Sequence, residues 1–158
     1  MADQTATTPV PAAVPPGARL AWQAVVDIGE RQALGASPLG ERFLVPILGG
    51  EFAGDIDGHT LHGRVLPGGA DRQLLRADGI KELDALYEMQ THDGAVLTVH
   101  NQVLIEERPG QERYAFSHVR VVAPQGPHDW INRRVFIGTL HSLRPQRQAV
   151  CVRVWQLG

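Results

Sequence analysis

Apolar and polar residues alternate along most of the chain, with the two-residue period of β-strands. The first alternating segment covers residues 18–28, and its apolar positions share one face: Leu20, Trp22, Ala24, Val26 and Ile28. Further segments of this kind follow, separated by short turns that contain glycine, proline or aspartate. The pattern predicts roughly eight to ten strands.

Short connections between successive strands favour an antiparallel, up-and-down order, and closure of the sheet removes exposed strand edges. We therefore predict an all-β fold, a single closed antiparallel β-barrel over residues 18–158. One short helical turn is expected in "PHDWINRR", residues 127–134, with Asp129 as its N-cap and Trp130 packed beneath it.

Residues 1–17, "MADQTATTPVPAAVPPG", differ from the rest because they are rich in alanine, threonine and proline. They lack the basic start and the continuous apolar run of a secretory signal. We predict a flexible tail that precedes a cytoplasmic barrel domain. The alternative is that the prolines hold the tail extended against a partner subunit of a homo-oligomer.

Charge and cysteine content narrow the function classes. The formal net charge is -2 and the basic residues form no block, so neither nucleic acid nor an anionic membrane is expected as a partner. No stretch approaches the roughly 20 apolar residues of a membrane span. Cys151 is the only cysteine, which excludes an intrachain disulfide and a cysteine-based zinc site.

The histidines do not show the spacing of a metal site. His59 and His62 are three residues apart and would point to opposite faces of a strand, and no His-x-His or His-x-x-x-His unit occurs. We therefore expect neither a metal nor another cofactor. His100 and His118 remain candidate acid–base groups, because the pKa of histidine lies near neutrality.

A series of short motifs resembles the family of bacterial and fungal proteins called DUF3237, or the UPF0311 group. Together they span most of the chain after the tail, and they are Gly49-Gly50-x-Phe52-x-Gly54, Gly63-x-Val65-x-Pro67-Gly68-Gly69-Ala70-Asp71, Leu83-Asp84-Ala85-x-Tyr87, Thr91-x-Asp93-Gly94, Asn101, Trp130-x-Asn132 and Phe136-x-Gly138. The resemblance implies a closed antiparallel β-barrel that holds a small-molecule pocket.

Three positions depart from the family pattern. Arg72 stands where an aromatic residue is common, Leu86 where an arginine is common, and Val103 where a glycine is common. If that arginine lines the pocket of the family, Leu86 makes the pocket of this chain less polar and less suited to an anionic substrate. Arg72 and Leu86 are accordingly expected among the substrate-binding residues.

Residues 82–89 form a strand with two unlike faces. Glu82, Asp84, Leu86 and Glu88 lie on one face, and Leu83, Ala85, Tyr87 and Met89 on the other. In one interpretation the acidic face is in water; in the other, Asp84 points into a wet barrel, where partial desolvation raises its pKa and suits it to act as a base. The resemblance selects Asp84. Tyr87 is the alternative pocket residue, because a regular strand cannot point both side chains inward.

The remaining site candidates lie in turns or on neighbouring strands. Gly68-Gly69 predicts a turn or bulge that re-aims the next side chain, Asp71. We expect the pocket to open near this turn and near Trp130, with Asp71 and Trp130 on the same rim and Trp130 in the core or the pocket wall. Asn101 and Asn132 either donate to a substrate oxygen or cap the backbone.

Two functions follow from these residues. The first is a cofactor-independent acid–base enzyme of isomerase, cyclase or lyase type. Its substrate would be a small apolar compound, a class that includes aromatic compounds. Its catalytic residues would come from Asp84, Asp71, Tyr87 and His100, and its substrate-binding residues from Asn101, Trp130, Asn132, Leu86 and Arg72. The second is a barrel that binds a hydrophobic ligand without changing it. An inward, partly buried carboxylate would favour the enzyme.

Overall fold

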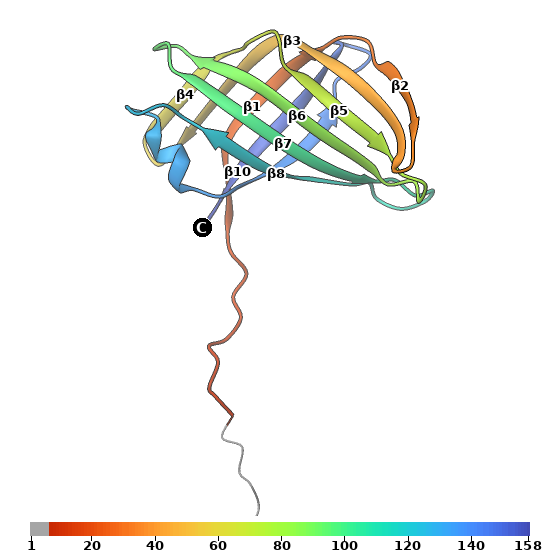
Figure 1. Cartoon of the computed structure of the whole chain (residues 1–158). Helices are drawn as coiled ribbons and strands as arrows, with labels where there is room; N and C mark the ends of the chain where they lie inside the picture. The colour runs from red at the N-terminus through yellow and green to blue at the C-terminus, as the bar shows by residue number, and fades with distance from the viewer. Residues whose placement is uncertain (1–6) are drawn as a thin grey trace, which may run out of the picture.

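Ten strands and one short 3-10 helix make up residues 7–158, the part of the chain that the computed structural model describes (Figure 1). In chain order the elements are β1 (Ala18–Ile28), β2 (Gln32–Ser37), β3 (Gly40–Ile56), β4 (His59–Val65), β5 (Ala70–Leu75), β6 (Lys81–Thr91), β7 (Val96–Glu106), β8 (Tyr114–Val122), η1 (Asp129–Arg133), β9 (Phe136–Ser142) and β10 (Ala149–Leu157). The number of strands agrees with the periodicity of the sequence.

The sheet closes on itself, and its neighbouring strands are antiparallel. Its order is β1-β10-β9-β8-β7-β6-β4-β3, and β3 returns to pair with β1. β4 and β5 share one place in the wall between β3 and β6, because β5 pairs with the start of β6 and β4 with its end. The structure is an eight-strand closed barrel with two extra strands, which confirms the predicted fold class.

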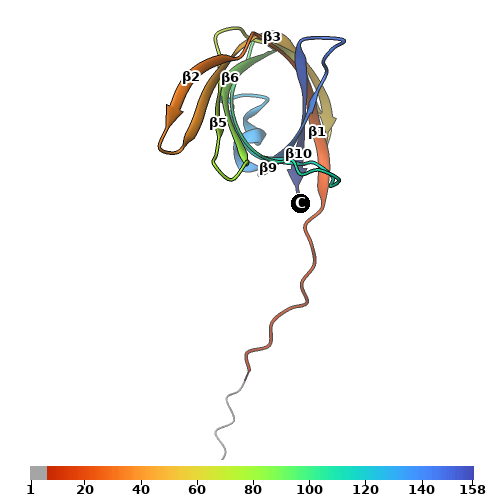
Figure 2. The same ribbon diagram turned by 90° about the vertical axis from the view of Figure 1, so that its right-hand side faces the viewer.

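The hairpin of β2 and the first part of β3 extends beyond the barrel wall (Figure 2). β2 pairs only with β3, and five of its six residues are exposed. β3 is 17 residues long and has an irregularity near Leu48, because Asp27 pairs with Gly49 and Ile28 with Ile47. Its first part therefore belongs to the hairpin and to β5, and its second part to β1 and β4.

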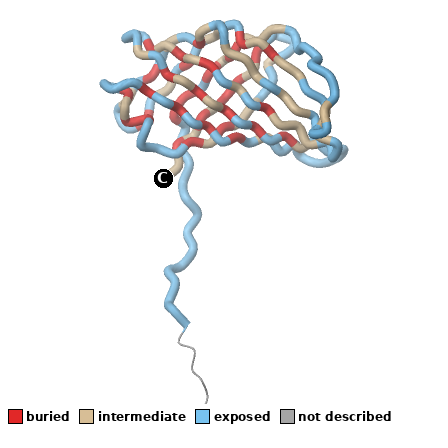
Figure 3. Tube along the Cα trace, viewed as in Figure 1, coloured by how far each residue is buried: buried red, intermediate tan, exposed pale blue. Residues whose placement is uncertain are grey.

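Side chains alternate between the barrel interior and solvent along each strand, which Figure 3 shows as alternating buried and exposed positions. One main cluster fills the interior, and its largest fully buried members include Trp22, Tyr87, Leu61, Met89 and Leu97. The prediction that Leu20 shares the inner face of β1 is wrong. A bulge between Leu20 and Trp22 reverses the alternation there and leaves Leu20 42% exposed.

One end of the barrel is filled by aromatic side chains, and we call it the packed end. Trp130 of η1 lies stacked on His59 and meets Phe136 edge-on, and Phe136 in turn contacts Trp22 at a ring-centroid distance of 5.1 Å. Trp130 is buried there, as expected. The prediction that Asp129 caps the helix is wrong: the N-cap is His128, which makes no side-chain capping bond, and Asp129 is already helical and pairs with Arg133.

The predicted tail covers residues 1–17, of which 1–6 lie outside the described residues. Residues 7–17 form no strand or helix, are exposed throughout, and run away from the barrel (Figures 1 and 3). In the described residues, no helix is both long enough and apolar enough to cross a membrane.

Candidate functional site

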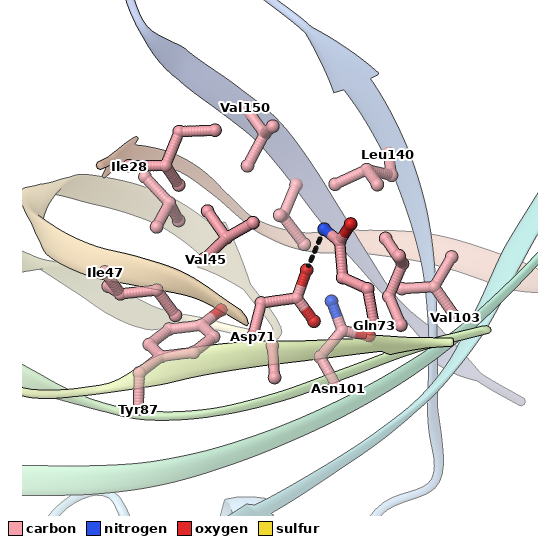
Figure 4. A pocket seen from close by; sticks show the side chains of 14 residues that line it. Ile28, Val45, Ile47, Asp71, Gln73, Tyr87, Asn101, Val103, Leu140 and Val150 are labelled. Carbon is pink, nitrogen blue, oxygen red and sulfur yellow. Dashed lines mark hydrogen bonds between the residues drawn. The ribbon is translucent and has the colours of Figure 1, made fainter. Parts of the chain in front are cut away.

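A pocket lies inside the barrel, away from the packed end, and the side chains of several strands line it (Figure 4). Its wall is aliphatic except for four polar residues. The aliphatic residues are Val26, Ile28, Val45, Ile47, Leu83, Ala85, Val103, Leu140, Val150 and Val152, and the polar ones are Asp71, Gln73, Tyr87 and Asn101. The cavity volume is about 80 Å³, enough for several water molecules or part of a small organic molecule.

Strand register explains why the barrel is hollow at this point. Asp71 of β5 pairs with Ala85 of β6, and Ala85 pairs with Asn101 of β7. The three side chains therefore form one inward layer across neighbouring strands. The Ala85 methyl group, the smallest of the three, leaves the space between Asp71 and Asn101 unfilled, whereas larger side chains fill the layers toward the packed end.

Asp71 is the carboxylate of the pocket. Its Oδ2 accepts a hydrogen bond of 2.8 Å from Gln73 Nε2, and its Oδ1 is buried with no hydrogen-bond partner in the described part of the chain. Burial raises the pKa of Asp71 to about 6, against the opposing effects of the Gln73 hydrogen bond and of the Lys81 charge. This is the change expected when a carboxyl group is desolvated without a directly paired cation.

Each of the other polar side chains of the pocket also has an atom without a partner. Tyr87 Oη, Asn101 Oδ1 and Gln73 Oε1 are buried and make no hydrogen bond within residues 7–158. Tyr87 and Asn101 are only 2% and 3% exposed, so water does not compensate them from outside the pocket. Burial also raises the pKa of Tyr87, which keeps its phenol protonated. Because buried polar groups are normally paired, this concentration of unpaired atoms is typical of a ligand site.

Gly69 allows β5 to lie close to β6 at the base of the pocket. A Cβ atom at this position would lie 2.6 Å from Tyr87 Cβ and 2.7 Å from the Leu86 carbonyl oxygen. The glycine therefore permits the close approach that brings Tyr87 beside the start of β5, where Asp71 follows two residues later.

The expectation that Asp84 faces the interior is wrong. Its side chain points outward, is 52% exposed and lies 2.6 Å from His100 Nε2, whose side chain is also on the outer surface. The reason is the alternation of β6: Tyr87, Leu83 and Met89 are buried, and a shift of one residue would expose all of them. The structure therefore places Tyr87 and Asp71, but neither Asp84 nor His100, at the pocket.

Four other predicted residues lie outside the pocket. Leu86 is 50% exposed and Arg72 is exposed, because both belong to the outer face. Asn132 bonds the backbone nitrogen and oxygen of Ala123, each at 2.9 Å, so it caps the backbone. Trp130 lies at the packed end, not on one rim with Asp71, and the expectation of a shared rim is wrong.

Sequence reasoning missed Gln73, which orients Asp71. The signal was present, because a strand that points residue 71 inward also points residue 73 inward. Asn101, the remaining predicted substrate-binding residue, does line the pocket. Within residues 7–158, no group of three or more histidine, cysteine, aspartate or glutamate side chains is arranged to hold a metal ion.

Comparisons with known proteins agree with the motif series. The model of the family described as "Protein of unknown function (DUF3237)" matches residues 16–157. A UPF0311 protein of Rhodopseudomonas palustris is 43% identical over 74 residues, 47% of this chain and 46% of the relative. A UPF0311 protein of Clostridium acetobutylicum is 41% identical over 63 residues, 40% of this chain and 37% of the relative. The chain spans about half the length, or less, of these curated relatives in the matched region.

Solved structures share the barrel over nearly the whole chain. The protein RPA1785 of Rhodopseudomonas palustris has a TM-score of 0.79 at 28% identity, with 92% of this chain and 100% of that chain covered. A β-barrel-like protein of Acinetobacter baumannii has a TM-score of 0.76 at 24% identity, with coverage of 93% and 100%. A protein described as an enzyme from Penicillium herquei has a TM-score of 0.73 at 23% identity, with coverage of 94% and 99%.

Proposed function

This chain belongs to the DUF3237 family, and from the pocket of its barrel we propose that it is a cofactor-independent acid–base enzyme for a small apolar substrate. One observation carries the proposal: the inward carboxylate of Asp71 has an oxygen, Oδ1, that is buried in an aliphatic pocket and has no partner. A barrel that only carried a hydrophobic ligand would gain nothing from a desolvated carboxylate in its wall.

Asp71 is the general base of this proposal. A pKa of about 6 leaves the carboxylate ionised at neutral pH and makes it a stronger base than an ordinary aspartate. The Gln73 amide holds Oδ2, so that Oδ1 is the oxygen directed at a substrate proton. Removal of the proton would leave the substrate as an anion, whose charge needs a donor nearby.

Tyr87 is the donor that we assign to this anion. Its buried phenol stays protonated, has no partner, and lines the same cavity as Asp71. A preorganised donor of this kind stabilises a developing oxyanion in a site that excludes water. Asn101 contributes an amide oxygen, Oδ1, that has no partner among residues 7–158, and it would accept a hydrogen bond from a substrate hydroxyl group.

These groups suit reactions that need only the transfer of a proton. Asp71 would take a proton from carbon or from a hydroxyl group and return it to another atom of the same molecule. The outcome would be an isomerisation, a ring closure, or a carbon–carbon cleavage. The protein from Penicillium herquei supports the proposal only to the extent that this barrel fold also occurs in a protein described as an enzyme.

Proton exchange tests the proposal even when the product is not identified. Small cyclic ketones, enones and phenols would be incubated with the protein in D₂O, and ¹H NMR would follow the exchange of acidic C–H protons. We expect catalysed exchange for at least one compound, and a fall of about two to four decades in its rate for Asp71→Asn. Asp84→Asn is the matched control, because it removes the same charge from the outer face.

The alternative is a hydrophobic-ligand carrier, which the mainly aliphatic lining favours. Thermal shift against the same compounds distinguishes the two functions, since a ligand at about 100 times its Kd adds roughly 2.7 kcal/mol to the free energy of unfolding. Compounds that raise the Tm equally for the parent protein and for Asp71→Asn, with no exchange in either, would establish the carrier and overturn the enzyme.

A further inference from the structure

The only lysine of the chain, Lys81, is the first residue of β6 and lies toward the end of the barrel opposite the packed end, which we call the open end. It precedes Leu83 by two residues on β6, so both side chains belong to the inner face of that strand. Its register partners are Leu75 of β5 and Ile105 of β7, one inward layer beyond Gln73 and Val103.

A second cation, Arg31, lies within range of an electrostatic effect on Lys81. The guanidinium of Arg31, in the turn between β1 and β2, lies 4.1 Å above the centre of the Phe43 ring. Phe43 pairs with Gln73 and precedes the pocket residue Val45 by two positions, so its side chain lies on the same face of β3 as that of Val45. The charge of Arg31 is near enough to Lys81 to lower the pKa of the ammonium group.

Neither cation forms an ion pair within residues 7–158, although the charges of Asp71 and Glu107 act on Lys81 from a greater distance and raise its pKa. No carboxylate lies within 4.0 Å of Lys81 or Arg31, whereas the nearby Arg113 pairs with Glu107 at 2.6 Å. Lys81 is also half-buried, and burial is the main reason that its pKa is lowered. A half-buried ammonium group without an ion pair is unfavourable until an anion binds to it.

Resting on the proposed function, we infer that the natural substrate is a small anion with an apolar body, bound with its charged group at Lys81 and its apolar body in the pocket. Lys81 is thus the residue that selects for the charge. The expectation that Leu86 disfavours an anionic substrate does not apply, because Leu86 lies on the outer face.

The charge also fixes which end of the substrate reacts. Lys81 precedes Ala85, the register partner of Asp71, by four residues on β6. The backbone positions of Lys81 and Asp71 are therefore about 13 Å apart along the strand direction. An anionic group is attracted to the open end and repelled from the Asp71 carboxylate. The uncharged end of the substrate therefore enters first and meets Asp71, Tyr87 and Asn101.

A pair of probes that differ only in charge tests the inference. Isothermal titration calorimetry would compare 4-phenylbutanoate with 4-phenylbutanamide on the full chain at low salt. We expect the carboxylate to bind about tenfold more tightly, as a hydrogen bond to a charged group allows. Lys81→Met should abolish this preference and leave the affinity for the amide unchanged. Added NaCl should weaken the binding of the carboxylate and leave the binding of the amide unchanged.

Two further variants complete the test. Arg120→Met removes one positive charge from the outer face of β8 and should keep the tenfold preference. Ala85→Leu fills the cavity beside Asp71 and should weaken both probes. Equal affinities for the two probes, no binding of either probe, or a preference that survives Lys81→Met would each overturn the inference. None of these outcomes tests the role of Asp71, which the exchange experiment decides separately.

Discussion

The two ends of the barrel are built from the same strands, but their carboxyl groups differ in hydrogen bonding and in pKa. At the packed end, Asp93 accepts a hydrogen bond from Thr91 and lies 2.9 Å from His128, and these contacts hold its pKa at about 2. In the pocket, toward the other end, Asp71 has one side-chain hydrogen bond, from Gln73, and a pKa of about 6. An aspartate carboxyl group thus has a lowered pKa where it is hydrogen-bonded at the packed end, and a raised pKa where it is desolvated in the pocket.

This difference separates stability from function. The packed end fills its interior with aromatic rings, and even its two unpaired indole nitrogens, of Trp22 and Trp130, carry no charge. The half of the barrel that holds the pocket keeps a cavity, and there one carboxylate oxygen of Asp71 and the Tyr87 hydroxyl have no partner among residues 7–158, at a cost in folding free energy. Substitutions at the first end should therefore change stability, and substitutions at the second should change binding and turnover.

Trp130→Ala should have the largest effect on folding. Removal of this buried ring from its contacts with His59 and Phe136 is expected to lower the free energy of unfolding by about 3 to 5 kcal/mol. Urea unfolding followed by circular dichroism would measure it. The folded fraction should still exchange substrate protons at the parental rate, and a loss of exchange would mean that the two ends are coupled.

Tyr87→Phe should leave the stability almost unchanged but lower the rate of proton exchange. It removes a phenol hydroxyl that has no partner, so the stability should change by less than about 1 kcal/mol. Loss of the proposed oxyanion donor should lower the exchange rate by about two to three decades. Exchange and unfolding would be measured on the same preparation. An unchanged rate would remove Tyr87 from the proposed mechanism.

Asp71→Asn should make stability less dependent on pH. The pKa of Asp71 is raised from 3.8 to about 6 in the folded state, so the folded protein binds its proton more tightly than the unfolded chain. The parent protein should therefore lose stability as the pH rises between these two values. The variant should be more stable by about 3 kcal/mol at pH 8, and equal to the parent protein near pH 3. Parallel curves for the two proteins would contradict the raised pKa.

Truncation of the tail should have the smallest effect. Residues 7–17 are exposed and run away from the barrel, so a chain that begins at Gly17 should keep its Tm and its affinity for pocket ligands. Differential scanning calorimetry and sedimentation velocity would be compared for the two lengths. A fall of many degrees, together with dissociation of an oligomer, would show that the tail binds a partner subunit.

Local patterns in the sequence were enough to predict the barrel. Alternation specifies strands wherever one face is buried, and the glycine-containing turns specify antiparallel neighbours, so the fold class could be predicted from local chemistry. The motif series likewise identified the family, and it included Asp71, Tyr87 and Asn101, three of the four polar pocket residues. The sequence could identify these three residues because close packing and strand spacing fix the intervals between the motif residues along the chain.

The choice of the inward carboxylate, in contrast, depends on contacts between strands. Asp84 and Asp71 both lie in strands of mixed polarity, and alternation alone leaves each strand two orientations. Burial of Tyr87, Leu83 and Met89 fixes the orientation of β6 and sends Asp84 to solvent. Register then places Asp71 opposite the small Ala85, where a cavity remains. Such a choice depends on the summed packing of several strands, which no single segment of the sequence contains.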